Sequence, residues 1–160
     1  IKSNRFKCLN QTIYSRCQQI HFNNISQSEL QTWAEGLLRD KGDKSVIPSY
    51  MTPKKLSALV EDGTFEDFKK LNKYLENLFL NGADGKHINN VIDLNIEFNE
   101  KLDYIIDFAL THSKSGKSNV HPVRMSDYIE DLSNFRENLI EINALNQRYA
   151  LNHLLLKIPN

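Results

Sequence analysis

Cysteines and long apolar runs are both scarce in this 160-residue sequence. The two cysteines, Cys8 and Cys17, form no CxxC pair, so the sequence has neither a disulfide framework nor a zinc-ribbon pattern. Reduced thiols in the cytoplasm are the simplest interpretation. No apolar run approaches the roughly 20 residues that cross a bilayer, and no signal peptide opens the sequence. We therefore expect a cytoplasmic protein with no membrane partner.

An excess of either charge is also absent, because 20 Lys and Arg residues balance 20 Asp and Glu residues. A chain without net charge is not drawn as a whole to nucleic acid or to an anionic membrane. Contact with DNA would have to come from a local patch or from partner subunits. The hydrophobic fraction of 40% is ordinary for a protein that builds a core. Because the first residue is Ile1 rather than methionine, we expect a fragment or an excised domain.

Apolar spacing near the N-terminus predicts a short strand followed by helices. Residues 18–22 alternate polar and apolar side chains, as a half-buried strand does. Ser26 and Glu29 fit the capping box that opens a helix, and apolar residues follow at helical spacing. Thr52 followed by Pro53 predicts the start of another helix, with threonine as the cap.

The rest of the sequence is predicted to be helical as well. Apolar residues recur at threes and fours in 65–79, 88–109, 128–142 and 151–158, with a polar loop expected at 111–122. No internal repeat is visible. These patterns predict a mainly α-helical chain with a small amount of β structure at its N-terminus.

The segment THSKSGKS, residues 111–118, ends like a phosphate-binding P-loop. A P-loop wraps backbone N–H groups around phosphates between a buried strand and the start of a helix. Here Thr111 stands where the first glycine is required, and the preceding residues have helical spacing. His121 and Pro122 are expected to stop any helix that follows. We interpret the segment as a solvated loop that binds no nucleotide.

The histidines are not spaced like metal ligands. They show no i, i+4 pair and no cysteine neighbour at metal-binding spacing, so we expect no metal site. The five histidines are His21, His87, His112, His121 and His153.

Two stretches of the sequence resemble known proteins. Residues 1–22, IKSNRFKCLNQTIYSRCQQIHF, resemble the part of clamp-loader ATPase subunits that runs from the sensor-1 strand to a Ser-Arg-Cys motif. The residues that match in order are Thr12, Ile13, Ser15, Arg16 and Cys17. Residues 135–158, FRENLIEINALNQRYALNHLLLKI, resemble the last helices of the delta-prime subunits of the bacterial DNA polymerase III clamp loader. That family ends in a Leu-Leu-Leu-basic-Ile string, which here is residues 154–158.

The resemblance implies a fold class and a division of the chain. The fold would be mainly α, with a short β remnant of an AAA+ core, a three-helix lid and a helical collar bundle. Residues 1–22 would end the AAA+ core, residues 23–63 would form the lid, and residues 64–160 would form the collar. The collar would join subunits into a ring, and the terminal helix would contribute to it. Its expected oligomerisation residues are Leu151, Leu154, Leu155, Leu156 and Ile158.

A catalytic role for one arginine is also implied by the resemblance. Arg16 would act as an arginine finger in trans, completing the ATP site of a neighbouring subunit, with Ser15 and Cys17 orienting the turn. Arginine suits this role because its planar fork stays charged and holds two phosphate oxygens. ATP-hydrolysing relatives have a sensor-2 arginine after a Gly-Ser pair at the start of the last lid helix. Here that glycine is absent and Lys54 stands near the arginine position, as in non-hydrolysing members.

The implied partners are the gamma/tau and delta subunits of the clamp loader, with the sliding clamp and primed DNA reached through the complex. ATP would be bound by neighbouring subunits, and no cofactor by this part of the chain. One alternative is a gamma/tau-like ATPase subunit whose Walker motifs lie upstream. The other is a generic helical interaction domain unrelated to replication, for which the Ser-Arg-Cys match would be a coincidence.

Overall fold

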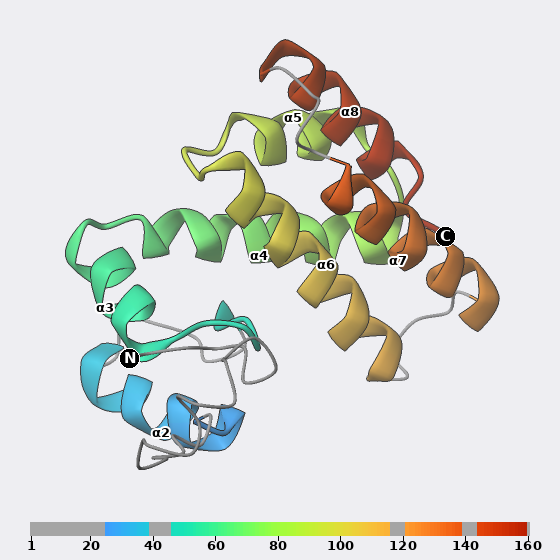
Figure 1. Ribbon diagram of the computed structural model, residues 1–160. Helices are drawn as coiled ribbons and strands as arrows, with labels where there is room; N and C mark the ends of the chain where they lie inside the picture. Colours follow the sequence, from blue (N-terminus) through green and yellow to red (C-terminus); the bar gives the residue numbers. More distant parts are fainter. Residues whose placement is uncertain (1–24, 39–45, 116–120, 139–143, 160) are drawn as a thin grey trace, which may run out of the picture.

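The computed structural model describes residues 25–38, 46–115, 121–138 and 144–159. Within these ranges the chain forms seven helices and no strand, which confirms the mainly α-helical prediction for this part of the protein (Figure 1). The helices are α2 (Gln27–Leu38), α3 (Pro53–Glu61), α4 (Phe65–Asn81), α5 (Gly85–Asp93), α6 (Phe98–Lys114), α7 (Pro122–Glu137) and α8 (Ala144–Leu156). None of these described helices is both long and apolar enough to span a bilayer. The strand predicted at 18–22 lies outside the described residues.

The predicted capping box at the start of α2 is confirmed. The Ser26 backbone N–H donates to Glu29 Oε2 at 2.8 Å, and the Glu29 backbone N–H donates to Ser26 Oγ at 3.2 Å. Hydrogen bonds from the Ser26 side chain and backbone lower the pKa of the Glu29 carboxyl. Both groups therefore satisfy backbone donors that the first helical turn would otherwise leave free.

Helix α3 also begins as the sequence predicts. Thr52 Oγ1 accepts a hydrogen bond from the Lys55 backbone N–H at 3.3 Å, and Pro53 occupies the first helical position. Gly63 (φ +81°) and Gly82 (φ +89°) follow α3 and α4 and adopt the left-handed region in which glycine is the favoured residue. These two glycines separate three successive helices.

Helix α4 connects the two ends of the molecule. It packs against α3 near its start and against α5 and α6 further along, while α7 lies on α6 and α8 lies on α5. Figure 1 shows α2 and α3 at one end of α4 and α5 to α8 grouped around the remainder. The buried apolar residues form a single cluster that runs from Leu30 in α2 to Ile158 after α8.

The connection between α6 and α7 differs from the prediction. The expected loop at 111–122 is shorter, because Thr111 to Lys114 still belong to α6. The expectation that Pro122 stops a helix is wrong, since Pro122 is the first residue of α7. At that position a missing N–H costs no hydrogen bond, and the fixed φ of proline suits the helix. His121 caps α7, with its Nδ1 accepting from the Val123 backbone N–H at 3.3 Å.

Candidate functional site

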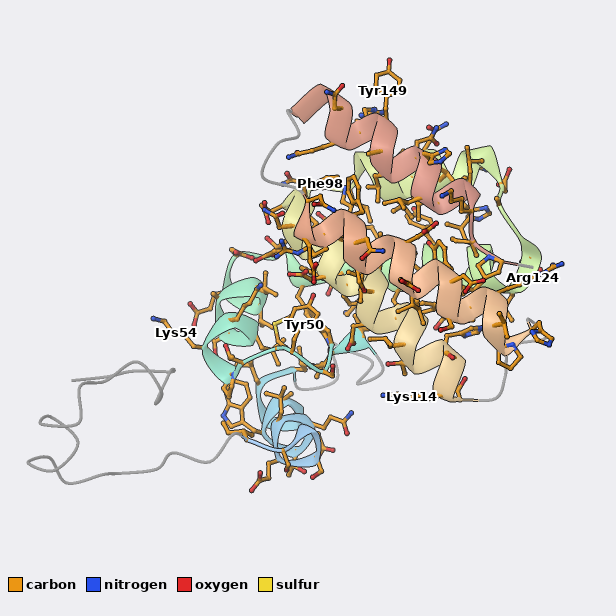
Figure 2. The ribbon with its side chains drawn as sticks, turned by 45° about the vertical axis from the view of Figure 1, so that its right-hand side comes forward. Tyr50, Lys54, Phe98, Lys114, Arg124 and Tyr149 are labelled. Carbon is orange, nitrogen blue, oxygen red and sulfur yellow. The ribbon has the colours of Figure 1, made fainter. Side chains whose placement is uncertain are left out.

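The residues predicted to act in catalysis lie outside the part of the chain that the structure describes. Ser15, Arg16 and Cys17 all fall in the range 1–24, so their arrangement stays a prediction. Lys54 is described and is the second residue of α3. Its side chain is exposed and points away from the helices in Figure 2. Lys54 is therefore accessible from solvent, and its predicted place near a sensor-2 position stays a prediction.

The predicted oligomerisation residues at the C-terminus fall into two groups. Four of them are buried in the core of this chain itself: Leu151, Leu154, Leu155 and Ile158. Leu156 differs, because 54% of its surface is exposed, and Tyr149 on the same helix is 67% exposed. Tyr149 and Leu156 are two helical turns apart and so lie on one face of α8. In Figure 2 the side chain of Tyr149 projects away from the bundle. Helix α8 therefore packs one side on α5 and presents an apolar pair to solvent.

Helix α6 carries three carboxylates at helical spacing, which we call the α6 acidic face. They are Glu100, Asp103 and Asp107. Residues spaced by three or four positions lie on the same side of a helix, so one face of α6 presents all three groups to the segments packed against it.

Two of these carboxylates hold the segment that contains α3. Glu100 Oε1 pairs with Lys55 Nζ at 2.7 Å. Asp107 Oδ2 accepts from the Ser49 backbone N–H at 3.1 Å, and its other oxygen accepts from the Ser49 hydroxyl. Tyr50 lies between α3 and α6 in Figure 2. Its pKa is raised, mainly by partial burial and to a smaller extent by the negative charges of the nearby carboxylates. Polar contacts to α6 thus add to the apolar core in holding residues 49–55 in place.

The remaining carboxylate of this face holds α7. Arg136 Nε donates to Asp103 Oδ1 at 2.6 Å, and Arg136 Nη2 lies 3.4 Å from Asp103 Oδ2. Hydrogen bonding to this carboxylate raises the pKa of Arg136. Because the guanidinium meets both oxygens, the pair fixes orientation as well as distance. One face of α6 thus positions both α3 and α7.

A buried polar chain crosses from α6 to α4. The Tyr104 hydroxyl lies 3.2 Å from the Val46 carbonyl oxygen and 3.0 Å from Asn72 Oδ1. Asn72 Nδ2 donates in turn to Glu76 Oε1 at 2.8 Å. Tyr104 and Asn72 are both buried, so these bonds satisfy groups that would be costly to leave unpaired. The chain ends at Glu76, on the rim of a cavity.

This cavity, about 530 Å³ in volume, lies between α2, residues 46–50, α4 and α6. Its described lining includes the apolar side chains of Ile47, Pro48, Leu80 and Phe108. Cavities of this size are typical of sites that enclose a ligand or a partner side chain.

Lys101 is buried at the corner between α5 and α6. Its side chain is 4% exposed, and its Nζ donates to the carbonyl oxygens of Ile92 at 2.8 Å and Leu94 at 3.1 Å. Burial lowers its pKa to about 8, with the charge of Asp93 acting in the opposite direction. These contacts satisfy carbonyls at the end of α5, where the helix leaves them without intrahelical partners.

The described histidines and carboxylates form no metal centre. Within the described ranges, no group of three or more His, Cys, Asp and Glu residues is close enough to hold an ion. His112 instead stacks on Phe108 with ring centroids 5.9 Å apart and meets Phe79 edge-on at 5.2 Å. His87 Nδ1 lies 2.8 Å from Asp84 Oδ2 at the start of α5.

The chain matches no model of a protein family, and neither the curated proteins nor the solved structures show a significant match to it. The functional interpretation therefore rests on the contacts described above and on the two sequence resemblances.

Sequence reasoning missed both the α6 acidic face and the cavity. The spacing of Glu100, Asp103 and Asp107 was the available signal, since it places three like charges on one helical face. Like charges at this spacing repel one another, so basic or hydrogen-bonding groups that pack against them are stabilising. Their partners lie far away in the sequence, for example Ser49 opposite Asp107, and no local pattern identifies them.

Proposed function

We propose that this chain is the C-terminal part of a non-hydrolysing, delta-prime-like subunit of the DNA polymerase III clamp loader. The observation that carries the proposal is the order of two resemblances along one helical chain. The Thr-Ile-x-Ser-Arg-Cys motif at 12–17 comes first, and the leucine-rich string at 154–158 comes last. Under this proposal residues 1–22 end the AAA+ core, residues 23–63 form the lid and residues 64–160 form the collar.

The proposed role has a catalytic part and an assembly part. Arg16 reaches the ATP held by a neighbouring subunit and stabilises the charge that develops during phosphoryl transfer. The subunit binds no cofactor in this region, and the ATP belongs to gamma/tau neighbours in a cytoplasmic ring that also contains delta. That ring loads the sliding clamp onto primed DNA.

Exposed apolar residues on α8 support the assembly part. Leu156 and Tyr149 lie on one face of the last helix, and both are more than half exposed. Covering a leucine side chain is worth roughly 1.5–3 kcal/mol, so a helix of a neighbouring subunit gains from packing there. Leu151, Leu154 and Leu155 of α8 already belong to the core of this chain.

Assembly with the partner subunits tests this proposal. The full-length subunit is mixed with gamma/tau and delta, and complex formation is measured by size-exclusion chromatography with mass detection. Leu156→Asp should weaken incorporation by about tenfold or more, because it places a charge in the covered apolar contact. The melting temperature of the 160-residue chain should change little, since Leu156 is exposed there.

Leu155→Asp is the matched comparison, because Leu155 is fully buried and its variant should lower the melting temperature. Normal assembly by a folded Leu156→Asp variant would contradict the assignment of this face. Failure of the unmodified subunit to join the ring would favour the generic helical interaction domain. That second candidate uses the same exposed pair of side chains on α8 for a different helical partner.

A further inference from the structure

The cavity between the α2–α3 end and α4 and α6 has no part in the proposed ring function. The described part of its lining comes from α2, residues 46–50, α4 and α6. Its volume of about 530 Å³ lies within the range of about 300–1,000 Å³ found for ligand sites. Both its walls and its rim carry side chains that indicate what it would hold.

The walls are largely apolar, and one apolar side chain extends beyond them. Ile47 and Phe108 line the cavity from residues 46–50 and from α6. Leu80, near the end of α4, also lines it, yet 69% of the surface of Leu80 is exposed. A small molecule inside the cavity would leave most of Leu80 in water. A polypeptide that enters the cavity with one side chain can cover Leu80 with the next.

Among the described lining residues, the acidic side chains of the cavity have no lysine or arginine beside them. These acidic residues are Glu76 and Asp107. Asp107 is held by the Ser49 backbone N–H at 3.1 Å and by the Ser49 hydroxyl, and Glu76 is held by Asn72 Nδ2 at 2.8 Å. Each carboxylate thus has a hydrogen-bond donor and retains lone pairs for another one, because an ionised carboxylate offers about four acceptor positions.

We propose that this cavity binds an arginine or lysine side chain of a partner polypeptide, with an adjacent apolar residue packed on Leu80. The apolar stem of the basic side chain fits the apolar walls, and its charged head lies between Glu76 and Asp107. Charge-assisted hydrogen bonds to carboxylates are stronger than neutral ones, so the cavity should bind a cationic side chain more tightly than a neutral one. This inference is independent of the clamp-loader proposal, because it concerns another surface of the chain.

Blocked tripeptides provide a direct test with the 160-residue chain. Leu-Arg-Leu, Leu-Gln-Leu and Leu-Glu-Leu are titrated to about 10 mM, and binding is followed by NMR shifts of the cavity residues. We expect Leu-Arg-Leu to bind with shifts at Phe108 and Leu80, and at least about tenfold more tightly than Leu-Gln-Leu. Leu-Glu-Leu should not bind, because its charge repels the two carboxylates.

Variants separate the charge from the fold. Glu76→Gln keeps the acceptor for Asn72 but removes the charge, and it should weaken Leu-Arg-Leu binding by about tenfold. Glu130→Gln on α7 removes an exposed carboxylate outside the described lining and should leave binding unchanged. Leu80→Ala should weaken binding of the Leu-Arg-Leu tripeptide. The same variant should bind free argininamide, which has no leucine to pack on Leu80, as well as the unmodified chain does.

Three results would overturn the proposal. The first is no binding of Leu-Arg-Leu by the unmodified chain. The second is equal affinity for the Arg and Gln peptides, or for the Glu76→Gln variant and the unmodified chain. The third is argininamide binding as tightly as the tripeptide, which would exclude a polypeptide as the source of the cation.

Discussion

Lys101 should make the stability of this protein rise with pH above about 8. Burial disfavours the ammonium form, so the pKa of Lys101 falls from 10.5 to about 8 in the folded chain. Between these two values the unfolded chain binds more protons than the folded one, and the free energy of unfolding therefore increases with pH. Integrating the two titrations gives a gain of about 2 kcal/mol between pH 7 and pH 9.5. Below pH 7 the contribution of Lys101 to the free energy of unfolding is constant.

The assay is urea unfolding, followed by far-UV circular dichroism, at a series of pH values from 6 to 9.5. Lys101→Met keeps an apolar stem of similar length and removes the titrating group. Subtracting the unfolding free energy of this variant from that of the unmodified protein isolates the contribution of Lys101, because all other titrating groups are common to both. The difference should be flat below pH 7 and then grow by about 2 kcal/mol in favour of the unmodified protein.

Two comparisons sharpen this experiment. Lys73→Met removes an exposed lysine of α4. It shows how the loss of a surface lysine changes the dependence of the unfolding free energy on pH. Asp93→Asn removes a negative charge that raises the pKa of Lys101, so the rise should begin at lower pH. A difference between the unmodified protein and Lys101→Met that stays flat up to pH 9.5 would refute the reasoning, because it would mean that Lys101 is not desolvated in the folded state.

Two further predictions concern local features of the helices. Gly63→Ala should lower the free energy of unfolding by about 1–2 kcal/mol in urea unfolding, because a Cβ at φ +81° is strained even though nothing lies within 4 Å of it; an unchanged midpoint would contradict this conformation. Tyr128→Phe should be neutral or raise the melting temperature, because the buried Tyr128 hydroxyl has no hydrogen-bond partner among the described residues. A loss of more than about 1 kcal/mol would show that the hydroxyl has a partner.

Local sequence patterns predicted the helix starts well. Ser26 with Glu29 and Thr52 with Pro53 make the capping contacts that their types and spacing indicate. These contacts form within four residues, so they depend little on the rest of the fold. Pro122 shows the limit of this reasoning, because proline both stops and starts helices, and the choice depends on the segment that follows.

Packing partners could not be predicted from the sequence. The consecutive residues Leu154, Leu155 and Leu156 look alike in the sequence, but the first two are buried and the third is more than half exposed. Which leucine faces outward depends on how α8 lies against α5, and that contact is set by residues far apart in the chain. The cavity has the same origin, since its described lining comes from segments that are far apart in the sequence.

Hydrolysis of ATP by the assembled clamp loader is the measurement that tests the proposed role of Arg16. The full-length subunit carrying Arg16→Ala is reconstituted with gamma/tau, delta, the sliding clamp and primed DNA, and single-turnover hydrolysis at the neighbouring site is measured. We expect normal assembly with a rate lower by roughly a thousandfold, and a partial loss for Arg16→Lys, which keeps the charge but not the fork. An unchanged hydrolysis rate in a fully assembled Arg16→Ala complex would show that Arg16 is not an arginine finger.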